Sequence, residues 1–236
     1  MLMKIVRFLI LAIACIGMWT TVSWAGVTVY AEGAYTDSDL VVYLYVDVQS
    51  DPILSYGVKL TYDPLDLGSP LVEKNDGDWY FGEKSSPYPT NNANPDTSTP
   101  GEVVIVGGKL DSATPQAGVT GNRVLLGKIS FSRLTENLPS AELYLGKGGN
   151  YSNFVQVNGV ELDHGLAGDD KIAPIGAVAI YQRGDANGDG VISGADRSTV
   201  KYYMVNGSYF SPWVDCNGDG NVSGADRSCI QYLMTH

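Results

Sequence analysis

Two nearly identical segments near the end of the chain constrain its fold more than any other feature. Residues 185–198 read DANGDGVISGADRS, and residues 215–228 read DCNGDGNVSGADRS. The copies start 30 residues apart and agree at eleven of fourteen positions, so we interpret them as an internal duplication. A duplication of this size predicts two copies of one small structural unit that pack against each other.

Each copy carries the pattern D-x-[DN]-x-D-G, which opens a calcium-binding loop of about 12 residues. Calcium prefers about six to eight oxygen ligands, and alternate residues of a tight loop direct their side chains toward its centre. The glycine at the sixth position permits the sharp backbone turn. The predicted ligands of two calcium ions are Asp185, Asn187, Asp189, the Val191 carbonyl, Ser193 through water and Asp196 in the first loop, and Asp215, Asn217, Asp219, the Asn221 carbonyl, Ser223 and Asp226 in the second.

The two loops differ from an ordinary EF-hand. The twelfth residue is Asp rather than Glu in both copies, so the following helix must approach the ion more closely. No amphipathic helix is predicted before either loop, because residues 175–182 are apolar and β-rich and residues 209–213 are aromatic and contain proline. Apolar residues at helical spacing follow each loop: Val200, Tyr203 and Met204, then Ile230, Leu233 and Met234. Each unit is therefore predicted to be a loop followed by one helix.

This arrangement resembles type I dockerin domains over about residues 182–236. The duplicated loop, the Asp at position twelve, the single exit helix and the C-terminal location carry the resemblance. It implies calcium-dependent binding to a cohesin domain on another secreted protein. The family pattern places partner contacts near positions ten, eleven, seventeen and eighteen of each copy, which are Gly194, Ala195, Lys201, Tyr202, Gly224, Ala225, Gln231 and Tyr232.

Two features of the dockerin-like segment leave alternatives open. Gly-Ala stands at the first pair of contact positions, where dockerins often have Ser-Thr, so either the specificity differs or these residues simply permit close helix approach. The near-identity of the copies would allow two binding modes related by a half-turn. An isolated calcium-binding duplicate and a thrombospondin-like calcium repeat are further readings, although the latter lacks exit helices.

Residues 26–181 show the pattern of an all-β module. Apolar and polar residues alternate in short runs separated by turn signals, and Asn158-Gly159 predicts a two-residue hairpin. Residues 84–101 are rich in Ser, Pro, Asn and Thr and predict a long surface loop. About nine strands at this spacing predict a sandwich. The predicted strands are 26–32, 40–48, 54–62, 103–106, 124–132, 141–145, 154–157, 160–162 and 177–182.

The order of these strands resembles cohesin domains, which are jelly-roll β-sandwiches related to carbohydrate-binding modules. Residues 40–48, 55–64, 103–107 and 127–131 carry the resemblance together with the opening strand. The predicted fold class is thus mainly β, with a small α C-terminal domain of two calcium loop–helix motifs. The resemblance implies that one sandwich face binds a dockerin-bearing protein or a polysaccharide. Aromatic residues that would stack on sugar, or are half-buried sandwich positions, are Tyr35, Tyr43, Trp79 and Tyr80.

Residues 1–25 have the layout of a secretory signal peptide. A basic start with Lys4 and Arg7 precedes an apolar run over residues 8–18 and small residues at the cleavage site, which predicts a secreted protein with no membrane span after signal removal. An uncleaved anchor and a lipid on Cys15 are alternatives. The remaining chain has 13 basic and 26 acidic residues, which argues against nucleic-acid binding. The predicted domains are 1–25, 26–181 and 182–236.

The two cysteines outside the leader, Cys216 and Cys229, either form a disulfide or remain two partly buried thiols. Their spacing suggests neither a zinc site nor a redox dithiol. The linker between the modules is nearly absent, so they are expected to pack or hinge tightly.

No catalytic constellation stands out in the sequence. The two histidines, His164 and His236, are not placed for a triad, and no nucleophile elbow, P-loop or zinc-helix motif is present. We therefore predict a noncatalytic secreted assembly protein linked to extracellular polysaccharide breakdown. A carbohydrate-binding module delivered by its dockerin is the alternative, and a small hydrolase tagged by a dockerin is a third reading.

Overall fold

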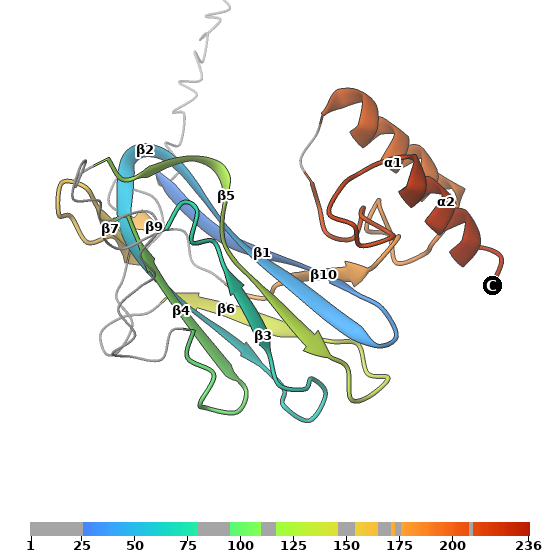
Figure 1. The fold of residues 1–236 in the computed structure, drawn as a ribbon, viewed down its shortest axis with the longest axis horizontal. Helices are drawn as coiled ribbons and strands as arrows, with labels where there is room; N and C mark the ends of the chain where they lie inside the picture. Colours follow the sequence, from blue (N-terminus) through green and yellow to red (C-terminus); the bar gives the residue numbers. More distant parts are fainter. Residues whose placement is uncertain are drawn as a thin grey trace, which may run out of the picture.

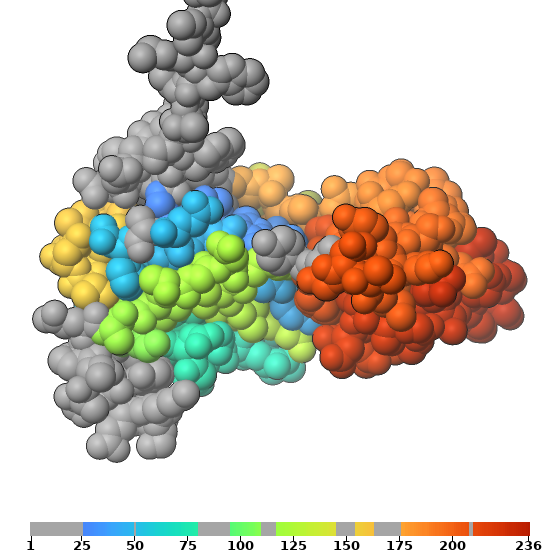
Figure 2. Space-filling model, turned by 90° about the horizontal axis from the view of Figure 1, so that it is seen from above, coloured from blue at the N-terminus to red at the C-terminus, as the bar shows by residue number. Residues whose placement is uncertain are grey.

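The computed structural model describes residues 26–79, 95–109, 117–145, 154–164, 171–172, 176–207 and 210–236. A β-sandwich is followed by a small helical lobe, and the lobe touches one end of the sandwich (Figures 1 and 2). The predicted mainly-β class with a small α C-terminal domain is confirmed. The predicted leader, Tyr80 and most of the predicted loop 84–101 lie outside the described residues. None of the described helices is long and apolar enough to cross a membrane.

Strand β2 belongs to both layers of the sandwich. Its first half pairs with β1 and β5, and its second half pairs with β4, β6 and β7. Strand β3 extends the first layer beyond β5, while β10 and β9 pair with β1 in parallel. The described strands are β1 (Val27–Tyr35), β2 (Asp39–Tyr62), β3 (Leu71–Lys74), β4 (Glu102–Gly108), β5 (Val119–Ser132), β6 (Ala141–Leu145), β7 (Val155–Gln156), β8 (Asp163–His164), β9 (Lys171–Ile172) and β10 (Ala179–Gln182).

Alternate residues of the strands face the core. Leu40, Val42 and Leu44 in the first half of β2 are fully buried, as are Val58 and Leu60 in its second half. All five belong to one hydrophobic cluster, so the core lies between the two layers. Pairing with β5 shifts register three times along β2, and such irregularities bend a strand. The two strands predicted over 40–48 and 54–62 are therefore one bent strand.

The Asn158-Gly159 turn has the expected hairpin geometry. Gly159 adopts a φ of 85°, and Val155 bridges Glu161 across the turn, as predicted for the Asn158-Gly159 hairpin. Strands β3, β8 and β9 were not predicted, because a run of two to four residues carries too little periodicity to be recognised.

The helical lobe has its own small core. Helix α1 (Gly194–Asn206) follows the first loop and helix α2 (Gly224–Leu233) follows the second, which confirms the predicted loop–helix order. One apolar residue of each helix, Val200 in α1 and Ile230 in α2, is fully buried. The apolar faces identified in the sequence are buried only in part: Met204, Leu233 and Met234 are 40 to 46% exposed, because two short helices cover only a narrow stripe of each other.

Candidate metal and partner-binding site

The first loop is organised around two buried carboxylates. Asp185 is 1% exposed and accepts hydrogen bonds from the backbone N–H groups of Asp189 at 3.1 Å and Gly190 at 2.9 Å. Asp196 is fully buried and accepts from the N–H groups of Asn187 at 3.1 Å and Ser193 at 2.7 Å. The first and twelfth positions of the loop are thus both held inside it by its own backbone.

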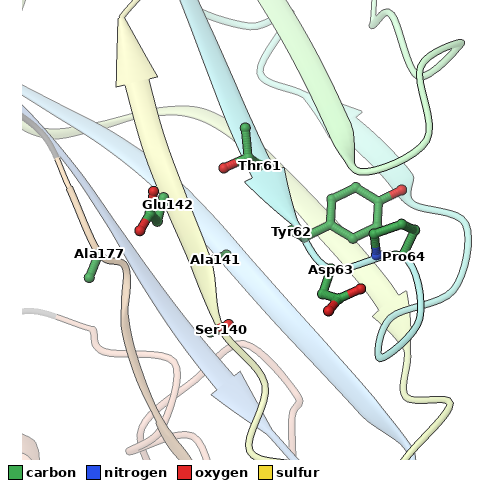
Figure 3. A pocket seen from close by; sticks show the side chains of 8 residues that line it. All are labelled: Thr61, Tyr62, Asp63, Pro64, Ser140, Ala141, Glu142 and Ala177. Carbon is green, nitrogen blue, oxygen red and sulfur yellow. The ribbon is translucent and has the colours of Figure 1, made fainter.

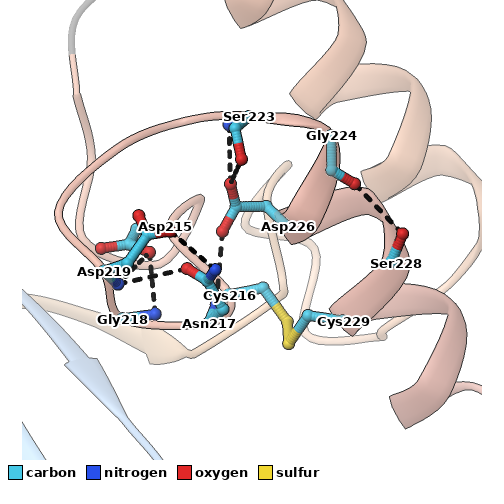
Figure 4. Close-up of a disulfide and its surroundings, with 10 residues drawn as sticks. All are labelled: Asp215, Cys216, Asn217, Gly218, Asp219, Ser223, Gly224, Asp226, Ser228 and Cys229. Carbon is cyan, nitrogen blue, oxygen red and sulfur yellow. Dashed lines mark hydrogen bonds between the residues drawn. A yellow bond between two sulfur atoms is a disulfide. The ribbon is translucent and has the colours of Figure 1, made fainter.

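The second loop repeats this geometry (Figure 4). Asp215 accepts from the N–H groups of Gly218 and Gly220, each at 2.8 Å, and Asp226 accepts from Asn217 at 3.2 Å and from Ser223 at 2.7 Å. Burial raises the pKa of the Asp215 carboxyl group, and the charge of the Asp226 carboxylate raises it further, while N–H donors oppose this. The Asp226 charge therefore acts on the Asp215 carboxyl group across the loop.

The third and fifth positions lie on the exposed side of each loop. Asp189 accepts from the Asn187 side-chain amide at 2.8 Å and from the Val191 N–H at 2.9 Å. Asp219 makes the same two contacts with Asn217 and Asn221. No group of three or more His, Cys, Asp or Glu side chains converges on one point within the residues that the structure describes. The structure brings together the predicted end ligands, but the predicted middle ligands bond to each other.

The residues of both loops nonetheless fit calcium. In the described part of the chain, no salt bridge joins Asp185, Asp196, Asp215 or Asp226 to a lysine or arginine. Burying ionised carboxylates without a compensating charge is costly, so a cation inside each loop would relieve that cost. The available donors are all oxygens, which suits a hard cation and does not suit zinc.

Ser193 and Ser223 have a second role that the sequence analysis missed. The Ser193 hydroxyl accepts from the Ala195 N–H at 3.1 Å, while Asp196 reaches back to the Ser193 N–H, and the same capping box begins α2. The signal was present in each Ser-Gly-Ala-Asp sequence, since a Ser followed three residues later by an acidic side chain caps helices. Asp196 and Asp226 thus each close their own loop and also cap the helix that follows it.

The predicted partner-contact residues lie mostly on the exposed surface of the lobe. Tyr202 is 62% exposed and Tyr232 is 60% exposed, at equivalent positions of the two helices. Gln231 differs, because it is half-buried and accepts a hydrogen bond from Arg197 at 2.6 Å. Sequence reasoning missed Val205, an exposed apolar residue beside Tyr202. The remaining predicted contacts are all exposed: Gly194, Ala195, Lys201, Gly224 and Ala225.

A disulfide ties the second loop to its helix. Cys216 and Cys229 are bonded, with Cα atoms 5.8 Å apart (Figure 4). The structure thereby selects one of the two alternatives that the sequence left open. The first copy has Ala186 and Thr199 at the matching positions, so the two otherwise similar halves of the lobe are stabilised differently.

We expect removal of this disulfide to destabilise the lobe by about 3 kcal/mol, because a crosslink closing a loop of roughly this size limits the entropy of the unfolded chain. The measurement is chemical denaturation of the Cys216→Ala/Cys229→Ala variant in calcium, followed by helical circular dichroism. Adding reductant should shift the wild-type midpoint and leave the variant unchanged. An unaltered midpoint in the variant would contradict the expectation.

Three of the four aromatic residues predicted as sugar contacts are buried or contact other side chains of the protein. Trp79 is 1% exposed, packs against Tyr56 and donates to the Leu125 carbonyl at 3.0 Å. Tyr43 contacts Phe210 of the lobe, and the Tyr35 ring lies 5.2 Å from the Arg133 guanidinium. These three rings do not form an open stacking surface.

A pocket of about 460 Å³ lies between β6 and the end of β2 (Figure 3). Its lining includes two carboxylates, Asp63 and Glu142, which project from opposite sides of the pocket and not toward each other. Asp63 accepts from the Leu65 N–H at 2.9 Å, and Glu142 accepts from the Tyr144 hydroxyl. A glycosidase needs two carboxylates that face each other across a bound sugar, and this pocket does not provide them.

Comparisons with known proteins agree with this geometry. Residues 183–234 match the family model of the dockerin type I domain, which confirms the resemblance predicted for the C-terminal segment. No curated protein matches the chain.

Several solved structures of cohesin modules are similar to part of the chain. The seventh ScaB type I cohesin from Pseudobacteroides cellulosolvens is 19% identical, with 66% of this chain and 92% of that chain covered and a TM-score of 0.43. CaCohA2 from Clostridium acetobutylicum is 17% identical, with coverages of 70% and 95% and a TM-score of 0.42. A Coh-OlpC–Doc435 complex from Clostridium thermocellum is 15% identical, with coverages of 69% and 97% and a TM-score of 0.40.

Proposed function

We propose that this chain is a noncatalytic, calcium-dependent assembly protein that joins two other proteins. Its C-terminal lobe would bind a cohesin-bearing partner, and its sandwich would act as a cohesin-like module for a dockerin-bearing partner. The observation that carries the proposal is the pair of loops, each with two buried carboxylates, inside a segment that matches the dockerin family. Two calcium ions would neutralise these carboxylates and fix the loops on which the helices begin.

The proposed module boundaries are residues 1–25 for a leader, 26–181 for the sandwich and 182–236 for the lobe. Strand β10 ends at Gln182 and the family match begins at residue 183, which supports a junction at this point. The leader supports a secreted location. A link to extracellular polysaccharide breakdown rests on the family resemblance alone.

The exposed helix surface is the proposed cohesin-binding site of the lobe. Tyr202 and Tyr232 project from equivalent positions of α1 and α2, with Val205 and Met234 exposed nearby in sequence. Aromatic residues of this kind are common binding hot spots. Because residues 185–198 and 215–228 are nearly identical and the two tyrosines occupy equivalent positions, the partner could bind in either of two orientations related by a half-turn.

Replacing both tyrosines should therefore weaken cohesin binding far more than replacing either one. We expect Tyr202→Ala or Tyr232→Ala alone to cost about two-fold in affinity, since the other orientation remains available. The double variant should lose at least about 30-fold, which corresponds to roughly 2 kcal/mol from a lost hot spot. The measurement is calorimetry against a panel of purified type I cohesins in calcium and in chelator.

A matched control is Tyr144→Ala, which removes an exposed tyrosine from the sandwich and should leave binding to the lobe unchanged. Cohesin binding that persists in the double variant would contradict the assignment of this surface. Binding that persists in chelator would contradict calcium dependence.

The outer surface of the β4–β2–β6 layer is the proposed site for a dockerin-bearing partner. Lys59 pairs with Glu102 at 3.0 Å and lies 5.9 Å from the centre of the Tyr144 ring, which gives this surface mixed charge and one exposed aromatic residue. The lobe leaves it accessible, because the described contacts of the lobe fall on the β1–β2–β5 layer and on the β10 junction. The carbohydrate-binding alternative has no comparable support from the described residues, since Trp79 is buried and Tyr35 and Tyr43 contact other side chains of the protein.

A further inference from the structure

Three tyrosines line the outer face of the first layer and define a tyrosine platform: Tyr30, Tyr43 and Tyr45. Tyr30 pairs with Tyr45 across β1 and β2, and their ring centres are 5.7 Å apart. Tyr43 follows at the next outward position of β2 and stacks on Tyr45 at 6.2 Å. Tyr45 is only 6% exposed although it faces outward, so other groups must cover it.

Arg123 on β5 is the group that covers the platform. Its guanidinium lies 4.2 Å from the centre of the Tyr45 ring and makes two hydrogen bonds to Glu32, at 2.9 and 2.8 Å. The backbone N–H of Arg123 donates to the Asp47 carboxylate at 2.6 Å, and the Arg123 backbone adopts a φ of 51°, which is uncommon for a residue other than glycine. Because the side chain is held on several sides, Arg123 presents a fixed cationic donor at the edge of the platform.

The helical lobe contacts this platform through the segment between its two halves. The Phe210 ring meets the Tyr43 ring edge to face, with centres 5.7 Å apart, and the Phe210 carbonyl accepts a hydrogen bond from Arg123. Edge-to-face aromatic pairs are attractive beyond the area they bury. This contact is separate from the covalent connection between the modules.

The covalent junction is itself closely packed. The Arg183 N–H donates to the Tyr35 carbonyl and the Gly184 N–H donates to the Trp213 carbonyl, each at 2.8 Å. The Tyr181 and Trp213 rings lie 4.8 Å apart, and Arg183 pairs with Asp39 at 3.6 Å. Two attachments at different points restrict rotation of the lobe, whereas the junction alone would leave a hinge.

The second loop lies at the seam between the modules. A cavity of about 70 Å³ separates Tyr43 and Lys128 of the sandwich from Pro212, Asp215 and Gly218 of the lobe and from Arg183 at the junction. Such a small space admits water but no larger ligand. Figure 2 shows the same close approach, with the lobe against the end of the sandwich.

From these contacts we propose that Phe210 docks permanently on the tyrosine platform, so that sandwich and lobe form one rigid body. The occupant of the platform is the chain's own segment, and the platform is an internal surface. This goes beyond the proposed function, because it fixes the angle between the two proposed partner-binding surfaces and removes the platform from the surfaces available to sugar or protein.

The test measures whether the two modules of the full chain tumble together. Backbone ¹⁵N relaxation in calcium gives a rotational correlation time for the sandwich and another for α1 and α2. We expect equal values for the wild type, and a shorter value for the lobe than for the sandwich in Phe210→Ala and in Tyr43→Ala. Tyr202→Ala, which alters an exposed helix residue away from the seam, is the matched control and should keep the values equal.

Unequal correlation times in the wild type would overturn the inference, and so would equal times in both platform variants. Amide shifts of α1 and α2 report separately whether the lobe is folded in each sample. A folded lobe that tumbles independently therefore refutes rigid docking and leaves the assembly function intact. Rigid docking together with no cohesin binding refutes the assembly function and leaves this inference intact.

Discussion

Excess chelator is expected to unfold the helical lobe while the sandwich remains folded. Among the described residues, the buried apolar core of the lobe has five members, with five partly buried residues packed against them: Ala186, Val200, Val214, Cys216 and Ile230, then Ile192, Tyr203, Trp213, Val222 and Cys229. So small a core supplies little stability, and four buried carboxylates oppose folding in the absence of a cation. Calcium at 100 times its dissociation constant would add about 2.7 kcal/mol per loop, which is comparable to the whole stability of such a module.

The measurement is helical circular dichroism of the full chain during chelator titration, with the backbone amide NMR signals of the sandwich strands as the reporter of the sandwich. We expect the helical signal to fall and to return when calcium is restored. The disulfide should leave the second half with more residual structure than the first. Helical dichroism that is unchanged in excess chelator would refute calcium-dependent folding.

A single substitution separates the two roles of the loop-closing aspartates. Loss of helix capping alone would destabilise Asp196→Ala by about 1 kcal/mol in calcium and in chelator alike. Loss of a calcium ligand should destabilise the variant in calcium by more than this, so the variant should need a higher calcium concentration than the wild type to gain its helical circular dichroism. Ser198→Ala, which changes an exposed helix residue outside the loop, is the control.

Replacing Glu32 with alanine is expected to destabilise the sandwich by about 3 to 5 kcal/mol. Glu32 and Arg123 are only 14 and 15% exposed, and they form a bidentate pair beside the tyrosine platform, with the Arg123 guanidinium over the Tyr45 ring. Removing Glu32 deprives the largely buried Arg123 guanidinium of two charge-assisted hydrogen bonds, which costs more than the pair itself contributes. The measurement is denaturant unfolding of the full chain, monitored through the signal of the sandwich.

Two comparisons make this expectation specific. Glu102→Ala removes the partner of Lys59 from a more exposed pair and should cost less than about 1 kcal/mol. Glu32→Met/Arg123→Met removes both charges, so it should be less destabilised than Glu32→Ala. If Glu32→Ala and Glu102→Ala cost the same, the pair of Glu32 and Arg123 has no special structural role.

Local features of this protein were readable from its sequence. The first and twelfth loop positions, the exit helices and the Asn158-Gly159 turn all depend on residues within about one turn or loop of each other. The alternation along Leu40, Val42 and Leu44 depends only on the two-residue period of a strand. These features can be recognised in the sequence without knowledge of the rest of the chain.

The tertiary structure alone decided the features that join distant parts of the chain. The sequence could not show that β2 spans both layers, because strand pairing depends on partners far away along the chain. It left the state of Cys216 and Cys229 open, since a disulfide requires their Cα atoms to approach within a few ångströms. It gave no sign that Phe210 contacts Tyr43 and Arg123, because residues that meet across an interface share no periodic pattern.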